Sequence, residues 1–247
     1  MMTLNTTKTV RELALEMPDA TRVFEKLKID YCCGGGKTLE AACAAAGVKI
    51  GDVADLLERA KALRDQGGAA DEFLSMPLSE LVNHILEKHH TFTKEEMERI
   101  GALTEKVCAA HGERHPELSR VGALFGKLCD DLRPHMMKEE QVLFPYIVRL
   151  EGAARGQCAP PLAPFGTVNN PVRMMMYEHD TAGELLRELR AATSDYTVPT
   201  DACMSYRTLY GALEAFEQDL HQHVHLENNV LFPRAVELES AAHSVSR

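Results

Sequence analysis

The stretch His135-Met136-Met137-Lys138-Glu139-Glu140-Gln141-Val142-Leu143-Phe144-Pro145 returns 88 residues later as His223-Val224-His225-Leu226-Glu227-Asn228-Asn229-Val230-Leu231-Phe232-Pro233. Both copies read His-x-x-x-Glu and end in Val-Leu-Phe-Pro. Another histidine stands upstream of each copy: His90 lies 45 residues before His135, and His179 lies 44 before His223. The second half of this region therefore repeats the first, and we interpret each half as a pair of helices.

The spacing within each copy has a chemical meaning. Residues four apart lie on one face of a helix, so each copy presents an imidazole and a carboxylate side by side. Two such helices facing each other, with one histidine from each partner helix, gather four imidazoles and two carboxylates. This nitrogen and oxygen set suits iron or manganese, and the interior of a helical bundle is where such centres are built. The pattern predicts a metal site made of His90, His135, Glu139, His179, His223 and Glu227, in which the two carboxylates can bridge two metal ions.

Other interpretations of these residues compete with a metal site. A single His-x-x-x-Glu is usually a solvated pair, but burying two copies without metal would leave polar groups unpaired at roughly 1–3 kcal/mol each. Helical periodicity does not separate His89 from His90; the repeat favours His90, and His89 is the alternative. A ferritin-like carboxylate site needs Glu-x-x-His on two helices, which occurs here once, at Glu87. The methionines at 136–137 and 174–176 are interpreted as core filling.

Composition predicts an all-α fold. The chain of 247 residues holds 29 Leu and 29 Ala against 16 Val and 5 Ile, and β-branched residues favour strands over helices. Amphipathic patterns place four long helices near 78–110, 117–150, 171–193 and 201–239. We expect a four-helix bundle over 77–239, preceded by a small helical domain over 1–65 that begins with a helix start at Thr9. The Gly-rich stretch 66–70 is interpreted as the linker between them.

Charge and cysteine usage exclude several classes. The net charge is -10, with 27 Lys+Arg against 37 Asp+Glu, so we expect no nucleic-acid partner. No apolar stretch approaches the roughly 18–20 residues of a membrane span, and the N-terminus has no signal-peptide core. Seven cysteines without a disulfide rhythm indicate a reducing, cytoplasmic setting.

Two of these cysteines form the motif Tyr31-Cys32-Cys33-Gly34-Gly35-Gly36, whose glycines indicate a turn. Adjacent thiols beside flexible backbone can approach a metal, a nitrosyl or a disulfide partner. The plainer interpretation is two small residues in a tight turn. The remaining cysteines are interpreted as structural; they are Cys43, Cys108, Cys129, Cys158 and Cys203.

These motifs resemble a known family. The region 77–239 is similar to the hemerythrin-like, His-His-Glu cation-binding domains, and with the Cys-Cys-Gly-Gly unit the chain closely resembles the repair-of-iron-centres family, the YtfE/ScdA group. The resemblance implies a hemerythrin-like bundle holding two non-haem irons, oxo- and carboxylate-bridged, with Glu139 and Glu227 as the bridging carboxylates. It also implies restoration of iron–sulfur clusters damaged by nitric oxide or peroxide, as an iron donor in the cytoplasm. Cys32 and Cys33 would then serve redox chemistry or the transfer of iron or nitric oxide.

Two other functions compete with repair. One is a di-iron nitric-oxide reductase, and the other is a hemerythrin-like protein that binds or senses O2 or nitric oxide. The partners implied are damaged iron–sulfur proteins and these small gases, and the resemblance also allows a homodimer. Glu140 and Glu178, which adjoin candidate ligands, are candidates for supporting or channel roles. The 152–171 loop is long for the group.

Overall fold

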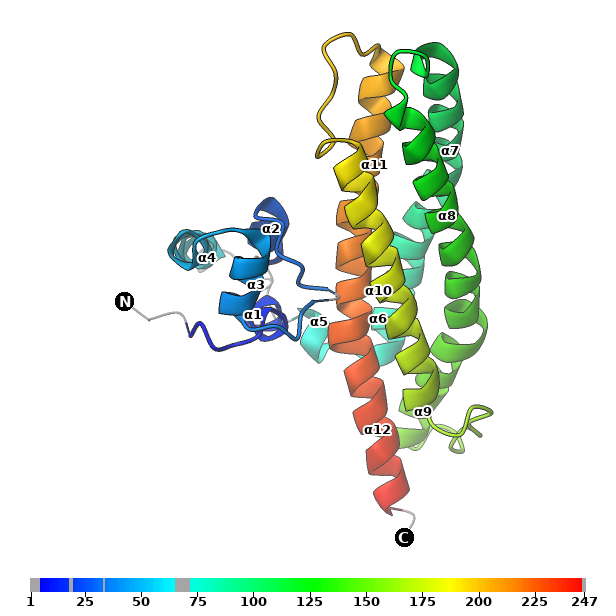
Figure 1. The fold of residues 1–247 in the computed structure, drawn as a ribbon. Helices are drawn as coiled ribbons and strands as arrows, with labels where there is room; N and C mark the ends of the chain where they lie inside the picture. The colour runs from blue at the N-terminus through cyan, green and yellow to red at the C-terminus, as the bar shows by residue number, and fades with distance from the viewer. Residues whose placement is uncertain (1–4, 18–19, 33, 65–71, 246–247) are drawn as a thin grey trace. The chain divides into compact units, whose positions relative to one another are not determined.

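The structure, a computed structural model, describes residues 5–17, 20–32, 34–64 and 72–245. Within these residues every regular element is a helix, so the predicted all-α fold is confirmed (Figure 1). The elements are α1 (Val10–Glu16), α2 (Ala20–Lys26), α3 (Leu39–Ala46), α4 (Ile50–Arg64), α5 (Glu72–Ser75), α6 (Leu78–His84), η1 (Ile85–His90), α7 (Thr91–His111), α8 (Glu117–Lys138), η2 (Glu139–Leu143), α9 (Phe144–Ala154), α10 (Asn169–Ala192), α11 (Met204–Leu226), η3 (Glu227–Leu231) and α12 (Phe232–Val245).

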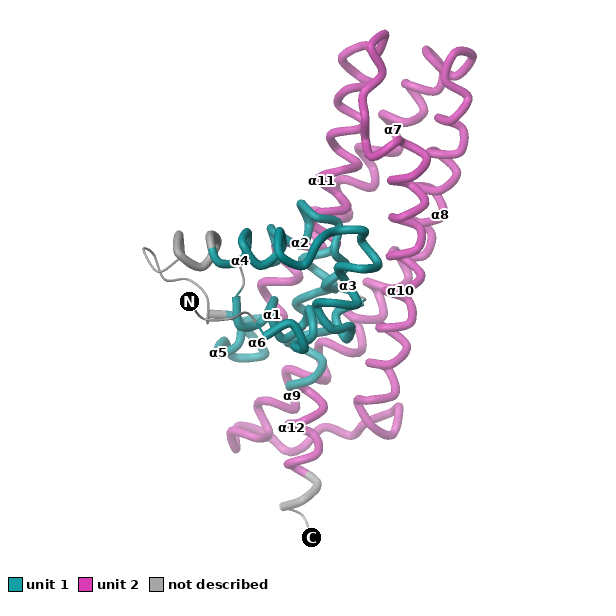
Figure 2. Tube along the Cα trace, turned by 60° about the vertical axis from the view of Figure 1, so that its left-hand side comes forward, with its two compact units in different colours: residues 1–81, 221–234 teal, residues 82–220, 235–247 magenta. Residues whose placement is uncertain are grey.

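The chain forms two compact units (Figure 2). Unit 1 comprises Met1–Leu81 and His221–Arg234, and unit 2 comprises Val82–Leu220 and Ala235–Arg247. The segment that carries the second sequence copy therefore groups with the N-terminal helices. The domain bounds 1–65 and 77–239 stay a prediction, and the stretch 66–70 lies outside the described residues.

In unit 1, the N-terminal helices enclose a small apolar core. The Thr9 side chain accepts a hydrogen bond from the backbone N–H of Glu12, and the Glu12 carboxylate accepts one from the backbone N–H of Thr9. This reciprocal cap confirms the predicted helix start, because it satisfies backbone donors that the first turn leaves open. The Thr38 side chain caps α3 by accepting from the backbone N–H of Ala41, and Thr38 pairs with Thr9 in an isolated antiparallel bridge. The buried core residues of this unit include Val10, Leu13, Phe24, Tyr31, Leu39, Val53 and Leu57.

The glycine-rich turn packs tightly against α1. The Gly35 carbonyl accepts a hydrogen bond from the backbone of Arg11 at 2.8 Å. A Cβ at position 35 would lie 2.7 Å from the carbonyl oxygen of Tyr31, so only glycine fits there. The predicted turn is confirmed, and Cys33 lies outside the described residues.

Unit 2 is built around a four-helix bundle of α7, α8, α10 and the unit-2 part of α11 (Figure 1). Helix α8 packs against both α7 and α10. The rings of Phe125 and Phe216 meet edge to face at 5.6 Å and join α8 to α11. Arg190 of α10 makes an ion pair with Glu217 of α11 at 2.7 Å. The predicted four long helices are confirmed to within a few residues.

Three of these helices are not continuous α-helix, which the sequence pattern did not predict. Each contains a π-helical segment: η1, η2 or η3. At η2 the backbone N–H of Phe144 donates to the carbonyl of Glu139, five residues earlier, and Phe232 does the same to Glu227 at η3. A proline follows each phenylalanine and has no N–H to continue the α-helical ladder. The two sequence copies thus share a local backbone distortion as well as residues.

The long connection between α9 and α10 is fixed by one buried carboxylate. Glu239 of α12 accepts hydrogen bonds from the Tyr146 hydroxyl at 2.6 Å and the Thr167 hydroxyl at 2.5 Å. It also accepts from the backbone N–H of Val168 at 2.9 Å, directly before α10. Glu239 therefore caps α10 from a distant helix and fixes the end of the loop.

Replacing Glu239 by glutamine is expected to lower the free energy of unfolding by about 1–3 kcal/mol. The amide has one acceptor oxygen instead of two and brings N–H donors towards groups that themselves donate. Urea denaturation followed by circular dichroism measures the change. The control is Glu237→Gln on the same helix, because that side chain is exposed. Equal stability of the two variants would contradict the anchoring role.

At one end of the bundle, His115 bridges two loops. Its Nδ1 lies 3.0 Å from Glu117 Oε1 and its Nε2 lies 3.0 Å from Asp201 Oδ1. Carboxylates only accept hydrogen bonds, so both imidazole nitrogens are protonated in this arrangement. The hydrogen bonds to Asp201 and then to Glu117 raise the pKa of His115 above its usual 6.5. The His115 hydrogen bond lowers the pKa of Asp201.

The substitution His115→Gln is therefore expected to destabilise the fold at pH 5.5 more than at pH 9. Because the pKa of His115 is higher in the folded protein than in the unfolded chain, its protonation stabilises the fold. This stabilisation is fully present below pH 6.5, the pKa in the unfolded chain, and is lost as the pH rises through the pKa in the folded protein. Asp201 is ionised at both pH values. Denaturation of wild type and variant at each pH gives the difference, and a difference independent of pH would contradict the charged pairing.

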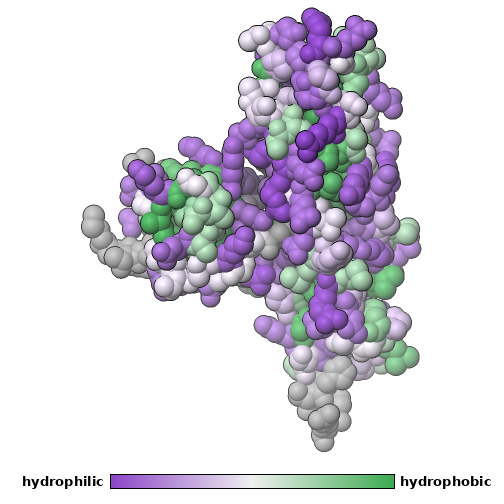
Figure 3. Space-filling view, in the orientation of Figure 1, coloured by the Kyte–Doolittle hydropathy of each residue, from purple (hydrophilic) through white to green (hydrophobic). Residues whose placement is uncertain are grey.

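The face of the bundle that Figure 3 shows is mostly hydrophilic, with hydrophobic side chains in separate patches. Among the helices of the described residues, none carries an apolar stretch long enough to cross a bilayer.

Candidate metal centre

An imidazole and carboxylate cluster lies inside unit 2. His90 ends η1, His135 lies near the end of α8, His179 lies on α10, and Glu139 begins η2. Glu139 Oε2 is 3.3 Å from His135 Nε2 and 3.5 Å from His90 Nε2. The Nε2 atoms of His135 and His179 are 3.0 Å apart. All four side chains are buried, with no more than 2% of any residue exposed. Bundle packing therefore brings together four of the six predicted ligands.

Two outer carboxylates fix the orientation of two of these imidazoles. His90 Nδ1 lies 2.7 Å from Glu140 Oε1, and His135 Nδ1 lies 2.8 Å from Glu178 Oε2. Because an ionised carboxylate only accepts, each Nδ1 donates its proton outward. With its Nδ1 proton held outward, each ring in its neutral form presents the lone pair of Nε2 towards Glu139, and this is the tautomer that a metal ligand needs.

A lysine supports each outer carboxylate. Lys94 lies 2.6 Å from Glu140, and Lys138 makes an ion pair with Glu178. Hydrogen bonds from His135 and Lys138 lower the pKa of Glu178 to about 2. Burial alone would raise the pKa of Glu140, but hydrogen bonds from Lys94 and His90 hold it below its usual value. The sequence suggested supporting roles for both glutamates; it did not suggest the lysines, although Lys94 lies one helical turn after His90.

The donor set fits a cation. Several electron-pair donors, the Nε2 atoms and the Glu139 carboxylate, converge within a buried space. Such atoms repel one another unless a proton or a positive ion lies between them. Imidazole and carboxylate ligands suit iron, manganese or zinc, and no thiolate belongs to this set. The ligand atoms of His135, Glu139 and His179 all lie within 4.8 Å of one another, as a shared ion requires.

The two neighbouring histidines on η1 have different surroundings. His89 Nδ1 lies 3.0 Å from Asp219 Oδ1 on α11, and the ring packs edge-on against His84 at 5.7 Å. His90 is the residue beside Glu139. This geometry favours His90 as the ligand and gives His89 a link between two helices.

The second sequence copy forms its own pair in unit 1. His223 Nε2 lies 3.0 Å from Glu227 Oε1, and no more than 1% of either residue is exposed. His223 lies on α11 and Glu227 begins η3, as His135 lies on α8 and Glu139 begins η2. The two copies therefore hold the same two side chains in the same local geometry.

The cysteine motif packs on this second copy within unit 1. The Tyr31 ring lies 5.3 Å from the His225 ring, and the Tyr31 carbonyl accepts from Asn229 Nδ2 at 3.3 Å. Asn229 also contacts His225 Nδ1 at 2.8 Å, and burial lowers the pKa of His225 to about 4, so the ring is neutral. The buried Cys32 follows Tyr31, and its thiol lies 3.5 Å from Asp30 Oδ1.

Replacing Glu178 by glutamine is expected to weaken metal binding by about 10- to 100-fold, because the neutral amide oxygen is a weaker acceptor for His135 than the carboxylate and forms no ion pair with Lys138. Competition with a coloured chelator measures the affinity. Glu184→Gln serves as the control, since Glu184 is an exposed residue on the same helix. If both variants bound metal as tightly as the wild type, Glu178 would have no role in orienting the ligand.

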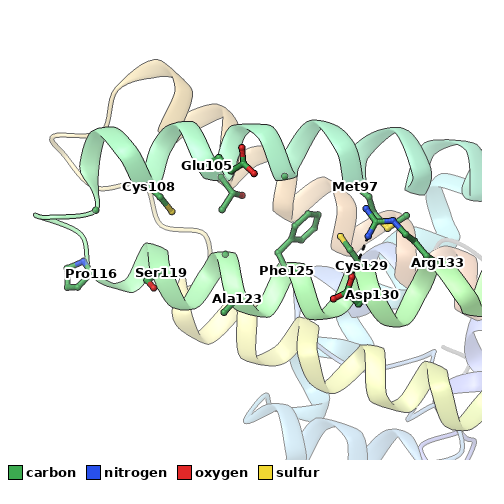
Figure 4. A pocket seen from close by; sticks show the side chains of 15 residues that line it. Met97, Glu105, Cys108, Pro116, Ser119, Ala123, Phe125, Cys129, Asp130 and Arg133 are labelled. Carbon is green, nitrogen blue, oxygen red and sulfur yellow. Dashed lines mark ion pairs between the residues drawn. The ribbon is translucent and has the colours of Figure 1, made fainter.

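A separate groove of about 780 Å³ runs between α7 and α8 (Figure 4). Small residues leave it open: a Cβ at Gly101 or Gly126 would meet nothing within 4 Å. Its lining also includes Met97, Phe125 and Arg133, but none of the candidate ligands. The groove is thus distinct from the metal-ligand cluster.

Two family models match this chain, and known proteins align with nearly all of it. The family model described as hemerythrin HHE cation binding domain matches residues 81–235, and a domain of unknown function (DUF542, ScdA_N) matches residues 6–61. The chain is 35% identical over 233 residues to the iron-sulfur cluster repair protein YtfE of Musicola paradisiaca, covering 94% of this chain and 98% of that protein. It is 33% identical over 225 residues to a probable iron-sulfur cluster repair protein of Haemophilus influenzae, covering 91% and 95% of the two chains.

Proposed function

Because the chain belongs to the hemerythrin HHE cation-binding family and aligns with iron-sulfur cluster repair proteins along nearly its whole length, we propose that it repairs iron–sulfur clusters damaged by nitrosative or oxidative stress. In this proposal it donates iron to damaged iron–sulfur proteins in the cytoplasm. The observation that carries the proposal is the buried cluster of His90, His135, His179 and Glu139, whose donor atoms are arranged for a cation.

We further propose that the second copy completes a centre for two irons, with Glu139 and Glu227 as bridging carboxylates. The support is the sequence repeat together with the matching local geometry of the His135–Glu139 and His223–Glu227 pairs. Such a set would offer four imidazoles and two carboxylates to the two ions, and these few ligands would allow exchange of iron or binding of nitric oxide or O2. Unlike a closed four-ligand structural site, it suits an ion that must leave again.

The chain's own residues prepare the ligands for this role. Glu140 and Glu178 hold the Nδ1 protons of His90 and His135, so the Nε2 atoms are the ones directed inward as ligands. Lys94 and Lys138 keep both glutamates ionised and offset part of their negative charge. Burial excludes water from the ligand atoms. These features bind and orient iron without fixing it through thiolates.

The cysteine pair is proposed to assist the exchange of iron or nitric oxide. Tyr31 packs on His225 and Asn229, which lie two residues after His223 and Glu227 respectively. This packing supports a position of Cys32 near the ligand-bearing helix. Cys33 enters the proposal through the sequence motif.

The test is iron transfer from anaerobically purified protein to an iron–sulfur enzyme inactivated with nitric oxide. We expect wild type to restore activity with a matching loss of its own iron, and Cys32→Ala/Cys33→Ala to keep its iron but transfer it slowly. Repair at the wild-type rate by the double variant would remove the cysteines from the mechanism. Sustained nitric-oxide consumption with an electron donor and no loss of iron would instead favour the reductase, and a reversible O2 adduct would favour an O2-binding protein. The homodimer stays a prediction for light scattering to test.

A further inference from the structure

A second chemically active pair lies at the end of α7, far from the candidate ligands. His111 Nε2 is 3.1 Å from the Sγ atom of Cys203. His111 follows His90 by 21 residues on one helical run, which places it about 30 Å away at 1.5 Å per residue. Cys203 is exposed, whereas His111 is buried with 6% of the residue exposed. The sequence alone indicated a structural role for Cys203, and the contact with His111 changes that interpretation.

The imidazole is held towards the thiol by its surroundings. The buried Tyr206 ring packs edge-on against the His111 ring at 5.4 Å. Tyr206 packs in the same way against His115 at 5.3 Å, while Glu117 and Asp201 hold the two nitrogens of His115. Among the described residues, Nδ1 of His111 has no hydrogen-bond partner, so its polar contact is made through the nitrogen that faces Cys203.

The helix ends favour transfer of the thiol proton to the imidazole. His111 is the last residue of α7, and a cation is stabilised at the C-terminal end of a helix. Cys203 directly precedes α11, where its carbonyl accepts the first-turn hydrogen bond from Arg207 at 3.1 Å. An anion is stabilised at the N-terminal end of a helix, and thiols placed there or beside an imidazolium are the reactive ones in proteins. Both charges of a thiolate–imidazolium pair therefore lie where the two helices favour them.

We propose that Cys203 and His111 form a thiol modification site that reacts with low-molecular-weight disulfides of the glutathione type. His111 takes the proton of the Cys203 thiol, and the thiolate attacks one sulfur of the disulfide. The old S–S bond breaks as the new one forms, and the leaving thiolate takes the proton from His111. Cys203 is oxidised to a mixed disulfide, and the small disulfide is reduced to one equivalent of thiol.

The other cysteines of unit 2 provide contrasts. Burial raises the pKa of Cys108, and it raises the pKa of Cys129 to about 11, so both thiols are protonated at neutral pH. Cys158 is exposed like Cys203, but its thiol contacts the Arg149 carbonyl instead of an imidazole. Cys158 is therefore the internal control for exposure without a base.

The test is alkylation of the full chain with iodoacetamide at pH 7, measured for each cysteine by peptide mass spectrometry. A free thiol is only a few per cent thiolate at this pH, so proton transfer to His111 is expected to make Cys203 about tenfold faster than Cys158. His111→Gln should bring Cys203 to the rate of Cys158. Oxidised glutathione should give a mixed disulfide on Cys203 that dithiothreitol reverses.

Equal rates at Cys203 and Cys158 in the wild type would overturn the proposal, as would a fast rate that persists in His111→Gln. Modification of the buried Cys129 reports loss of the fold in any variant. If His111→Gln does not fold, the same comparison is made on the wild type in denaturant. Unfolding separates Cys203 from His111, so Cys203 and Cys158 should then react at equal rates. A rate advantage for Cys203 that survives denaturation would also overturn the proposal, because it would come from neighbouring sequence alone.

Discussion

Replacing His135 by alanine is expected to remove most of the iron from protein purified without oxygen, where the wild type should hold two irons per chain. The Nε2 atom of His135 lies 3.3 Å from Glu139 Oε2 and 3.0 Å from His179 Nε2, so the substitution removes one ligand atom from the middle of the cluster. The loss also releases Glu178, which holds the ring from outside. Elemental analysis of both proteins measures iron and also reports manganese, which the same ligands accept.

The control for this experiment is His115→Ala, because His115 lies just beyond the end of α7 opposite to His90, where its side chain contacts Glu117, Asp201 and Tyr206. That variant should keep the wild-type iron content. Circular dichroism should show that His135→Ala remains helical, since the apolar core of the bundle is unchanged. Equal iron in wild type and His135→Ala, or none in either, would mean that the repeated motif is structural or loads another metal.

The substitutions His90→Gln and His89→Gln are expected to affect different properties of the protein, metal binding and stability. His90→Gln should lose metal, because it removes an imidazole directed at Glu139. His89→Gln should keep metal but lower the free energy of unfolding by about 1–3 kcal/mol, because it weakens the contact with Asp219. These adjacent residues thus separate metal binding from stability.

The metal content of both variants is measured first. Urea denaturation is then measured on both variants after their metal has been removed. Removing metal first prevents bound iron from adding its own stabilisation to the result. The reverse pattern, with iron lost in His89→Gln and retained in His90→Gln, would make His89 the ligand.

The repeat made much of this molecule predictable. Its spacing placed His135 beside Glu139 and His223 beside Glu227, and both pairs are in contact. Helical periodicity placed the long helices, and Thr9 marked the start of the first one. These features are local, so a pattern over a few residues contains them.

Features that depend on packing between distant elements were not predictable in this way. Asp219 supports His89 across 130 residues, and Glu239 fixes a loop more than 70 residues away. The methionine interpretation was wrong in part: Met136 and Met175 are buried, but Met137 and Met174 are about half exposed. Neighbouring residues on a helix point about 100° apart, so a run of methionines cannot all face the core.

The matched π-helical segments constrain the length of the chain. A π turn amounts to one residue inserted into an α-helix, which turns everything after it by about 100°. Phe144 and Phe232 both follow such an insertion and are both buried. Deleting one residue from either segment would hardly change composition, yet it would swing the phenylalanine away from the core while the histidine stayed in place. The number of residues between the histidine and the phenylalanine thus sets the directions in which the two side chains point. Because both copies keep this number, they can keep the same local geometry although most of their other side chains differ.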